Sequence, residues 1–146
     1  MFGRGDGHDV VVYASDDASR VGTIVFRDGV APADVKLTRA WDDQDSGLYA
    51  LQLAIVGTDD RITVNNFFYS NTPDNQWNPV QFVTFADGTV WTKANLVAKS
   101  NVATDGDDTL TGTSDNDSVD GAGGNDSISG LAGNDSLAGG TGNDSL

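Results

Sequence analysis

Residues 121–146 read GAGGNDSISGLAGNDSLAGGTGNDSL, a run in which aspartate returns every nine residues. A large aliphatic side chain follows each aspartate by two positions, and in most units glycine stands two and five positions before it. Extending this register towards the amino terminus gives five units, with their aspartates at Asp108, Asp117, Asp126, Asp135 and Asp144. The period matches the nonapeptide G-G-x-G-x-D-x-U-x, in which U is aliphatic, and it predicts a parallel β-roll over residues 101–146.

The recurring glycines and aspartates predict calcium sites that are shared between turns. Calcium takes about six to eight oxygen ligands from carboxylates and backbone carbonyls, more than one such turn can supply. In a two-sheet roll each unit stacks on the next but one, so the pairs expected to share ions are Asp108 with Asp126, Asp117 with Asp135, and Asp126 with Asp144. The candidate ligands are these five aspartates together with the turn glycines Gly106, Gly121, Gly124, Gly130, Gly133, Gly139 and Gly142.

Without metal, little holds this segment together. Aspartates on strands ~4.8 Å apart repel each other by roughly 0.9 kcal/mol in water. The seven large aliphatic side chains of residues 101–146 cannot offset a chain entropy of about 1–2 kcal/mol per residue. Calcium converts the repulsion into attraction, so we expect binding and folding to be one event, with affinities of ~10⁻⁴–10⁻³ M. A flexible linker is the alternative, but a linker gives no reason for a nine-residue period.

The five units differ in regularity. The last unit fits every defined position, whereas the second carries Thr113 and Asp115 where glycines are expected. Aspartate tolerates left-handed backbone, so Asp115 weakens its unit without excluding it. The first unit lacks its opening glycines, so three shared ions is an upper limit.

The composition separates residues 101–146 from residues 1–100. All 22 acidic residues are aspartate, and the net charge of −14 argues against nucleic acid as a partner. All 8 lysines and arginines and every aromatic residue lie in residues 1–100. The absence of cysteine excludes disulfides and thiolate metal sites, and no stretch approaches the ~18 apolar residues that membrane insertion would need.

Residues 10–100 alternate short apolar runs with turn signals, which predicts an all-β domain with an antiparallel, sandwich-like sheet. The expected strands lie within residues 10–13, 23–26, 35–38, 48–55, 61–64 and 80–85, with a hairpin loop at 42–47. A single turn is expected at residues 31–34 and a short helix at 92–97, with Thr92 as its N-cap.

Two segments of this domain share one pattern. Residues 24–30 and 83–89 both read apolar-x-Phe-x-Asp-Gly, so that Ile24 corresponds to Val83 and Phe26 to Phe85. An internal duplication and the chance recurrence of one hairpin type both explain this pattern.

Together these motifs resemble a known family. Residues 103–146 resemble the haemolysin-type calcium-binding repeats of RTX (repeats-in-toxin) proteins, and residues 10–98 resemble the haemolysin-type calcium-binding related domain through residues 24–35, 57–64 and 83–91. Residues 2–9 resemble the last turn of a preceding array, so the expected division is 1–9, 10–100 and 101–146. The resemblance implies a segment of a larger secreted bacterial protein, exported by a type I system, whose roll folds when it meets external calcium.

We expect the module to be non-enzymatic and name no catalytic residue. With one histidine, His8, no cysteine and no glutamate, a hydrolase triad is hard to assemble. The rival hypothesis is a recognition module that binds polysaccharide or a cell-surface partner through the first domain, with calcium only structural. The aromatic side chains that could line such a groove are Trp41, Phe67, Phe68, Tyr69, Trp77 and Trp91. Core packing is the stronger expectation for most of them, with Trp77 the best surface candidate.

Overall fold

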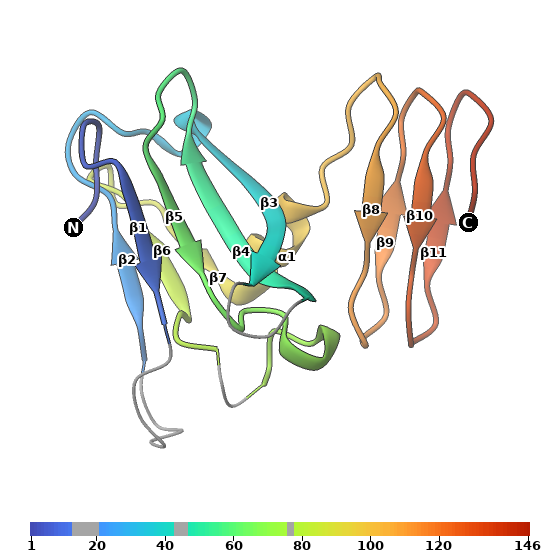
Figure 1. Cartoon of the computed structure of the whole chain (residues 1–146), viewed down its shortest axis with the longest axis horizontal. Helices are drawn as coiled ribbons and strands as arrows, with labels where there is room; N and C mark the ends of the chain where they lie inside the picture. Colours follow the sequence, from blue (N-terminus) through green and yellow to red (C-terminus); the bar gives the residue numbers. More distant parts are fainter. Residues whose placement is uncertain (13–20, 43–46, 76–77) are drawn as a thin grey trace. The chain divides into compact units, whose positions relative to one another are not determined.

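The computed structural model describes residues 1–12, 21–42, 47–75 and 78–146, with the backbone alone for residues 41, 42 and 47–49. The chain forms two compact units, Met1–Ser100 and Asn101–Leu146 (Figure 1). The boundary between the units coincides with the change in composition, because every aromatic and basic residue belongs to the first unit.

A four-stranded sheet forms one part of the first unit. Its order is β1 (His8–Val11), β5 (Arg61–Val64), β4 (Gly47–Ile55) and β3 (Val35–Asp42). The β3–β4 and β4–β5 pairs are antiparallel, whereas β1 joins β5 in parallel, with Val11 opposite Val64. The expectation of a purely antiparallel sheet is therefore wrong here. Alternation of apolar residues reports which face is buried and not strand direction, and the long connection between β1 and β5 permits parallel pairing.

The second sheet brings the two copies of the shared motif together. It contains β2 (Thr23–Val25), β6 (Phe82–Thr84) and β7 (Val90–Thr92), with β2 parallel to β6 and β6 antiparallel to β7. Ile24 is opposite Val83, so the register of the strands equals the sequence offset of the motif. The rings of Phe26 and Phe85 stack with centroids 5.1 Å apart. This equivalence supports the duplication hypothesis, because a hairpin that recurs by chance has no reason to stack on its copy.

The short helical elements lie where the sequence predicts them, apart from one additional turn. A 3₁₀ turn covers Pro32–Asp34, an unpredicted second covers Tyr69–Asn71, and α1 spans Lys93–Ser100. Thr92 caps α1, since its hydroxyl accepts the Asn95 amide at 3.4 Å while Asn95 Oδ1 accepts the Thr92 amide at 3.0 Å. Within the described part of the chain, no helix has the length and apolarity needed to cross a membrane.

The first unit has a continuous hydrophobic core between these elements. It includes Phe26, Leu51, Leu53, Ile55, Phe67, Phe68, Val83, Trp91 and Leu96. Because Phe67, Phe68 and Trp91 are buried in this core, they do not form the exposed aromatic groove considered above. Trp77 lies outside the described residues, and the Trp41 side chain is likewise not described.

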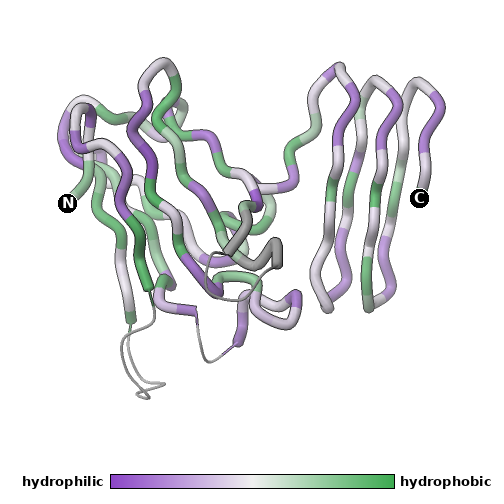
Figure 2. Tube along the Cα trace, in the orientation of Figure 1, coloured by the Kyte–Doolittle hydropathy of each residue, from purple (hydrophilic) through white to green (hydrophobic). Residues whose placement is uncertain are grey.

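The second unit consists of four three-residue strands in two small parallel sheets. The strands are β8 (Thr109–Thr111), β9 (Ser118–Asp120), β10 (Ser127–Ser129) and β11 (Ser136–Ala138). β10 pairs with β8 and β11 with β9, so each strand lies beside the strand that is two nine-residue repeats away (Figure 1). Hydrophobic and hydrophilic stretches alternate along this part of the chain (Figure 2). The buried core is small and contains Leu110, Val119 and Ile128, with Ala103 and Leu137 packed against it.

Candidate metal centre

The five repeat aspartates occupy equivalent places in the second unit. Four of them stand immediately before a strand, and the fifth precedes a residue that bridges in parallel to β10. In chain order they are Asp108 before β8, Asp117 before β9, Asp126 before β10, Asp135 before β11, and Asp144 before Ser145. Their common position follows from the three-residue strand, whose central aliphatic side chain points into the core and fixes the register of the turn before it.

The parallel register stacks the aspartate of each nine-residue repeat on the aspartate two repeats later. The backbone amide of the earlier residue donates to Oδ1 of the later one, from Asp108 to Asp126 at 2.8 Å, from Asp117 to Asp135 at 2.9 Å, and from Asp126 to Asp144 at 3.0 Å. The three pairs predicted from the sequence are therefore neighbours. Each of these contacts uses one carboxylate oxygen and leaves Oδ2 for another partner.

Asp126 has an unsatisfied oxygen inside the unit. Its side chain is only 3% exposed, and Oδ2 is buried without a hydrogen-bond partner. A buried polar atom left in this state costs about 1–3 kcal/mol, and more when it is charged. Buried carboxylates in proteins are therefore paired with a cation or coordinate a metal.

Gly121 makes the space around this oxygen. A Cβ atom on Gly121 would lie 2.3 Å from Asp126 Oδ2 and 2.5 Å from the Gly139 carbonyl oxygen. Both oxygens are thus close to one point, and their separation cannot exceed the total of these two distances. That separation is within the ~5 Å across which two oxygens coordinate one calcium ion. The carboxylate of one turn and the carbonyl of the stacked turn therefore place two oxygens, of the kind that hard cations prefer, beside a space that only glycine leaves open.

The other opening glycines have similar surroundings. A Cβ atom on Gly112 would lie 2.7 Å from both Asp117 Oδ2 and the Gly130 carbonyl oxygen. On Gly130 and Gly139 it would lie 2.3 Å from Oδ2 of the aspartate of the same turn. Close approach of the carboxylate thus requires glycine at the start of four units.

The turns nevertheless fall into two conformations. In the last three nine-residue repeats the second residue has positive φ, at 65° for Ala122, 71° for Leu131 and 91° for Gly140. In these repeats the fourth residue has positive φ as well, as in Gly124 at 110°. Thr104 and Thr113 occupy the second position of the first two nine-residue repeats, and neither they nor Asp115 have positive φ. Asp115 therefore does not adopt the left-handed backbone that the sequence suggested.

The predicted turn glycines follow this division. Gly124, Gly133 and Gly142 have positive φ, and a Cβ atom on any of them would lie within 2.4 Å of the backbone of the turn two units earlier. Gly106 is different, because its surroundings hold only the Thr104 hydroxyl, at 3.8 Å from such a Cβ. The sequence prediction thus groups Gly106 with glycines whose environment it does not share.

Comparison with known families now bears on this geometry. Residues 102–137 and 112–146 match the RTX calcium-binding nonapeptide repeat. The second unit is an RTX calcium-binding repeat array. Residues 51–95, in the first unit, match the haemolysin-type calcium binding protein related domain, so the chain carries the two families in the order that its motifs predict. No curated protein and no solved structure matches the chain.

The RTX repeats bind Ca²⁺. Among the described residues, no group of three or more histidine or acidic side chains is placed to hold a metal ion. The stacking of one carboxylate per turn over carbonyl groups accounts for this result, because calcium accepts backbone oxygens as readily as carboxylates.

Sequence reasoning missed a second ladder within the RTX array. The side-chain oxygens of Asp107, Asn116 and Asn125 accept the backbone amides of the equivalent residues two units later, at 2.7, 2.7 and 2.9 Å. The signal was present as the asparagine or aspartate that precedes each repeat aspartate. These amides would otherwise be unpaired at the turn, so the fifth position of the repeat stabilises the stack without metal.

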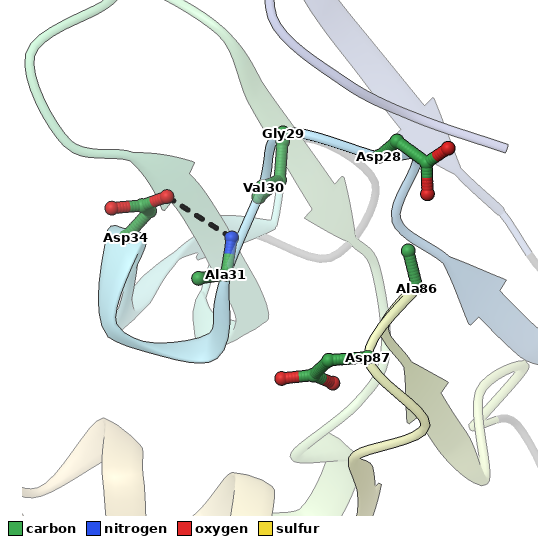
Figure 3. A pocket seen from close by; sticks show the side chains of 7 residues that line it. All are labelled: Asp28, Gly29, Val30, Ala31, Asp34, Ala86 and Asp87. Atoms are coloured by element: carbon green, nitrogen blue, oxygen red, sulfur yellow. Dashed lines mark hydrogen bonds between the residues drawn. The ribbon is translucent and has the colours of Figure 1, made fainter.

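The first unit has an acidic cavity that differs from the array. Its volume is about 430 Å³, and Asp28, Asp34 and Asp87 line it (Figure 3). Asp34 accepts the Ala31 amide at 3.0 Å and pairs with Arg4 at 3.3 Å, and all three carboxylates are at least partly exposed. This cavity lacks the buried unpaired oxygen of Asp126.

Proposed function

We propose that the RTX array of this chain is a calcium-dependent parallel β-roll in which ions are held between stacked turns, each turn with the next but one. The observation that carries this proposal is Oδ2 of Asp126, a buried carboxylate oxygen without a protein partner. The nearby Gly139 carbonyl is a second oxygen of the kind that calcium prefers. The ligands would be the repeat aspartates Asp108, Asp117, Asp126, Asp135 and Asp144 with turn carbonyls from the predicted glycines.

The small core of the array supports coupling between binding and folding. Only three large aliphatic side chains, those of Leu110, Val119 and Ile128, are buried there, whereas the whole of Asn101–Leu146 must be ordered. Apolar burial of this extent does not offset the conformational entropy of the segment. Because a metal site absent from the unfolded chain contributes its binding free energy to folding, calcium would supply the missing stability.

The module would accordingly serve a secreted bacterial RTX-type protein as a non-catalytic, calcium-triggered folding segment. Low calcium before export would leave the array unfolded, and higher external calcium, at affinities of ~10⁻⁴–10⁻³ M, would fold it afterwards. The first unit keeps its own core and needs no metal for its folding in this scheme.

A calcium titration of the whole chain tests the proposal with two independent signals. All three tryptophans lie in residues 1–100, so tryptophan fluorescence reports the first unit alone, while far-ultraviolet circular dichroism reports both units. We expect calcium to increase the β signal while tryptophan emission stays constant. Asp126→Asn should weaken calcium binding by at least ~10-fold, since charge-assisted ligation is lost. Asp28→Asn, at an exposed aspartate of the first unit, is the matched control. Spectra that do not change up to ~10 mM calcium would contradict the proposal.

A further inference from the structure

In the first two turns of the RTX array, a threonine donates hydrogen bonds to Oδ2 of the repeat aspartate. In the second turn, Asp117 Oδ2 accepts the Thr113 amide at 2.6 Å and the Thr113 hydroxyl at 3.0 Å. The same hydroxyl accepts the Asp115 amide at 3.2 Å, so it both donates and accepts a hydrogen bond. Thr113 is only 2% exposed, and its hydrogen bonds to Asp117 and Asp115 are partly buried in the turn.

The first turn repeats this arrangement. Asp108 Oδ2 accepts the Thr104 amide at 2.7 Å and the Thr104 hydroxyl at 3.0 Å, and the same hydroxyl accepts the Gly106 amide at 3.2 Å. A threonine at the second position thus occupies the carboxylate oxygen that has no partner in Asp126.

The third turn lacks this device. Its second residue, Ala122, has no hydroxyl and adopts φ of 65°, which turns the backbone away from the capping conformation. A β-branched threonine is disfavoured at positive φ, so the residue type at this position selects the turn conformation. The consequence is that Asp126 Oδ2 keeps no protein donor, although the opening glycine and the stacked carbonyl are placed around it much as they are around Asp117.

We propose that Thr104 and Thr113 replace calcium in the first two turns, so that only the stacked pair of Asp126 and Asp144 holds an ion in this chain. This inference rests on the proposed function and sets the number and place of the ions. The aspartate pairs that begin at Asp108 and Asp117 are closed by protein donors, which supply the partial positive charge that a cation would otherwise bring.

A metal-free start has a physical use in a repeat array. Terminal repeats of a solenoid are atypical because they cap the stack, and the first turns to form bear the cost of nucleation. When threonine hydrogen bonds stabilise the first two turns, β8 and β9 are already in place for β10 and β11 to pair with. Calcium is then needed only to add the later turns.

Counting bound calcium in the whole chain by isothermal titration calorimetry tests this inference. The wild-type chain should bind one ion. Thr113→Ala, which gives the second turn the residue found in the third, should bind two. Ala122→Thr should lower the affinity of the wild-type site by at least ~10-fold, because the new hydroxyl and amide would occupy Asp126 Oδ2. Leu131→Ala changes the same repeat position without adding or removing a hydroxyl and should leave one ion bound.

Hydrogen exchange in excess chelator supplies a second readout. The amides of Thr113 and Asp115 should exchange at least ~10-fold more slowly than those of Gly140 and Gly142. Thr113→Ala should remove that difference. Circular dichroism at saturating calcium verifies the folding of each variant, and Ala122→Thr remains decisive if Thr113→Ala does not fold.

The possible failures are distinguishable. If the wild-type chain binds two or more ions, or if Ala122→Thr binds calcium as tightly as the wild type, the threonine inference is wrong while the proposed function stands. Uniform exchange across the array in chelator would also overturn the inference. If the wild-type chain binds no calcium up to ~10 mM, the proposed function itself fails.

Discussion

Asp60 in the first unit and Asp126 in the second are both buried aspartates, at 6% and 3% exposure, but the chain completes the environment of only one of them. Asp60 lies at the turn before β5, where its Oδ2 accepts the Gly5 amide at 2.8 Å and its Oδ1 accepts the Gly7 amide at 2.7 Å. Asp126 receives one amide, from Asp108, and its other oxygen has no partner. The first unit therefore supplies hydrogen-bond donors to both oxygens of its buried carboxylate, whereas the second unit leaves one oxygen without a donor from the chain.

The same contrast holds for the cores. Among the described residues, eighteen buried hydrophobic side chains pack together in the first unit and three in the second. A unit of about 100 residues with its own core is expected to fold alone, whereas a short array with three buried aliphatic side chains needs a metal or another staple. The two units should thus respond oppositely to removal of metal and to core mutations.

Calcium removal should produce the largest difference between the units. In excess chelator, we expect the later turns of the RTX array to lose their strands while the first unit keeps its fold. Limited proteolysis with a broad-specificity protease, followed by mass spectrometry, should then show cleavage near Leu131 and Leu137 but none within the strands β4 and β5 themselves. Equal sensitivity of both units to the chelator would contradict the division into self-sufficient and metal-dependent parts.

Truncation of the first core should have the opposite selectivity. Phe26 is 1% exposed and lies between Phe2 and Phe85, so Phe26→Ala should lower the free energy of unfolding of the first unit by about 3–5 kcal/mol. Urea denaturation followed by tryptophan fluorescence measures this loss. Calcium affinity of the array should not change. Val90→Ala, at a half-exposed residue of the same sheet, is the control and should cost far less.

Filling the space beside Asp126 should impair calcium binding by a smaller amount. The Cβ atom introduced by Gly121→Ala would meet Asp126 Oδ2 at 2.3 Å and the Gly139 carbonyl at 2.5 Å. Such overpacking costs about 1–3 kcal/mol, which raises the calcium dissociation constant roughly 5- to 150-fold. Gly106→Ala is the matched control, because a Cβ there meets nothing closer than 3.8 Å. Calorimetry that gives the same affinity for both variants would show that the space beside Gly121 is not part of the site.

The periodic part of the chain was largely predictable from the sequence. The nine-residue period fixed the inward aliphatic positions and the pairing of each unit with the next but one, because a three-residue strand leaves only one register that buries Leu110, Val119 and Ile128 together. The roles of Thr104 and Thr113 were not predictable in this way. They depend on which donors reach a carboxylate four residues later, and that choice is made by backbone conformation.

The first unit was predictable only in part. Its strand positions and the capped helix follow from local patterns, since alternation and N-cap residues are local signals. Parallel pairing of β1 with β5 and of β2 with β6 joins segments that are far apart in the sequence. No local pattern encodes such partners. The only sequence hint was the spacing between the two Phe-x-Asp-Gly motifs, which proved to be the register of β2 on β6.

Asp60 should give the first unit a smaller, acid-dependent loss of stability. The Gly5 amide, and then the Gly7 amide, hold the pKa of Asp60 below its ordinary value. Because the pKa is lower in the folded state, the stabilisation is complete above the unfolded value of about 4 and is lost as the pH falls through the lower folded value. We therefore expect urea denaturation, followed by tryptophan fluorescence, to show a free energy of unfolding that decreases below about pH 4.

Asp60→Asn isolates this carboxylate, because the variant has no charge to lose at that position. Its free energy of unfolding should be lower than that of the wild type at neutral pH, and it should decrease less steeply in acid. Asp87→Asn, at an exposed aspartate, should keep the wild-type slope. Identical slopes for wild type and Asp60→Asn would mean that the two glycine amides do not stabilise the ionised carboxylate. The first unit would then share with the array a buried aspartate whose charge the fold does not satisfy.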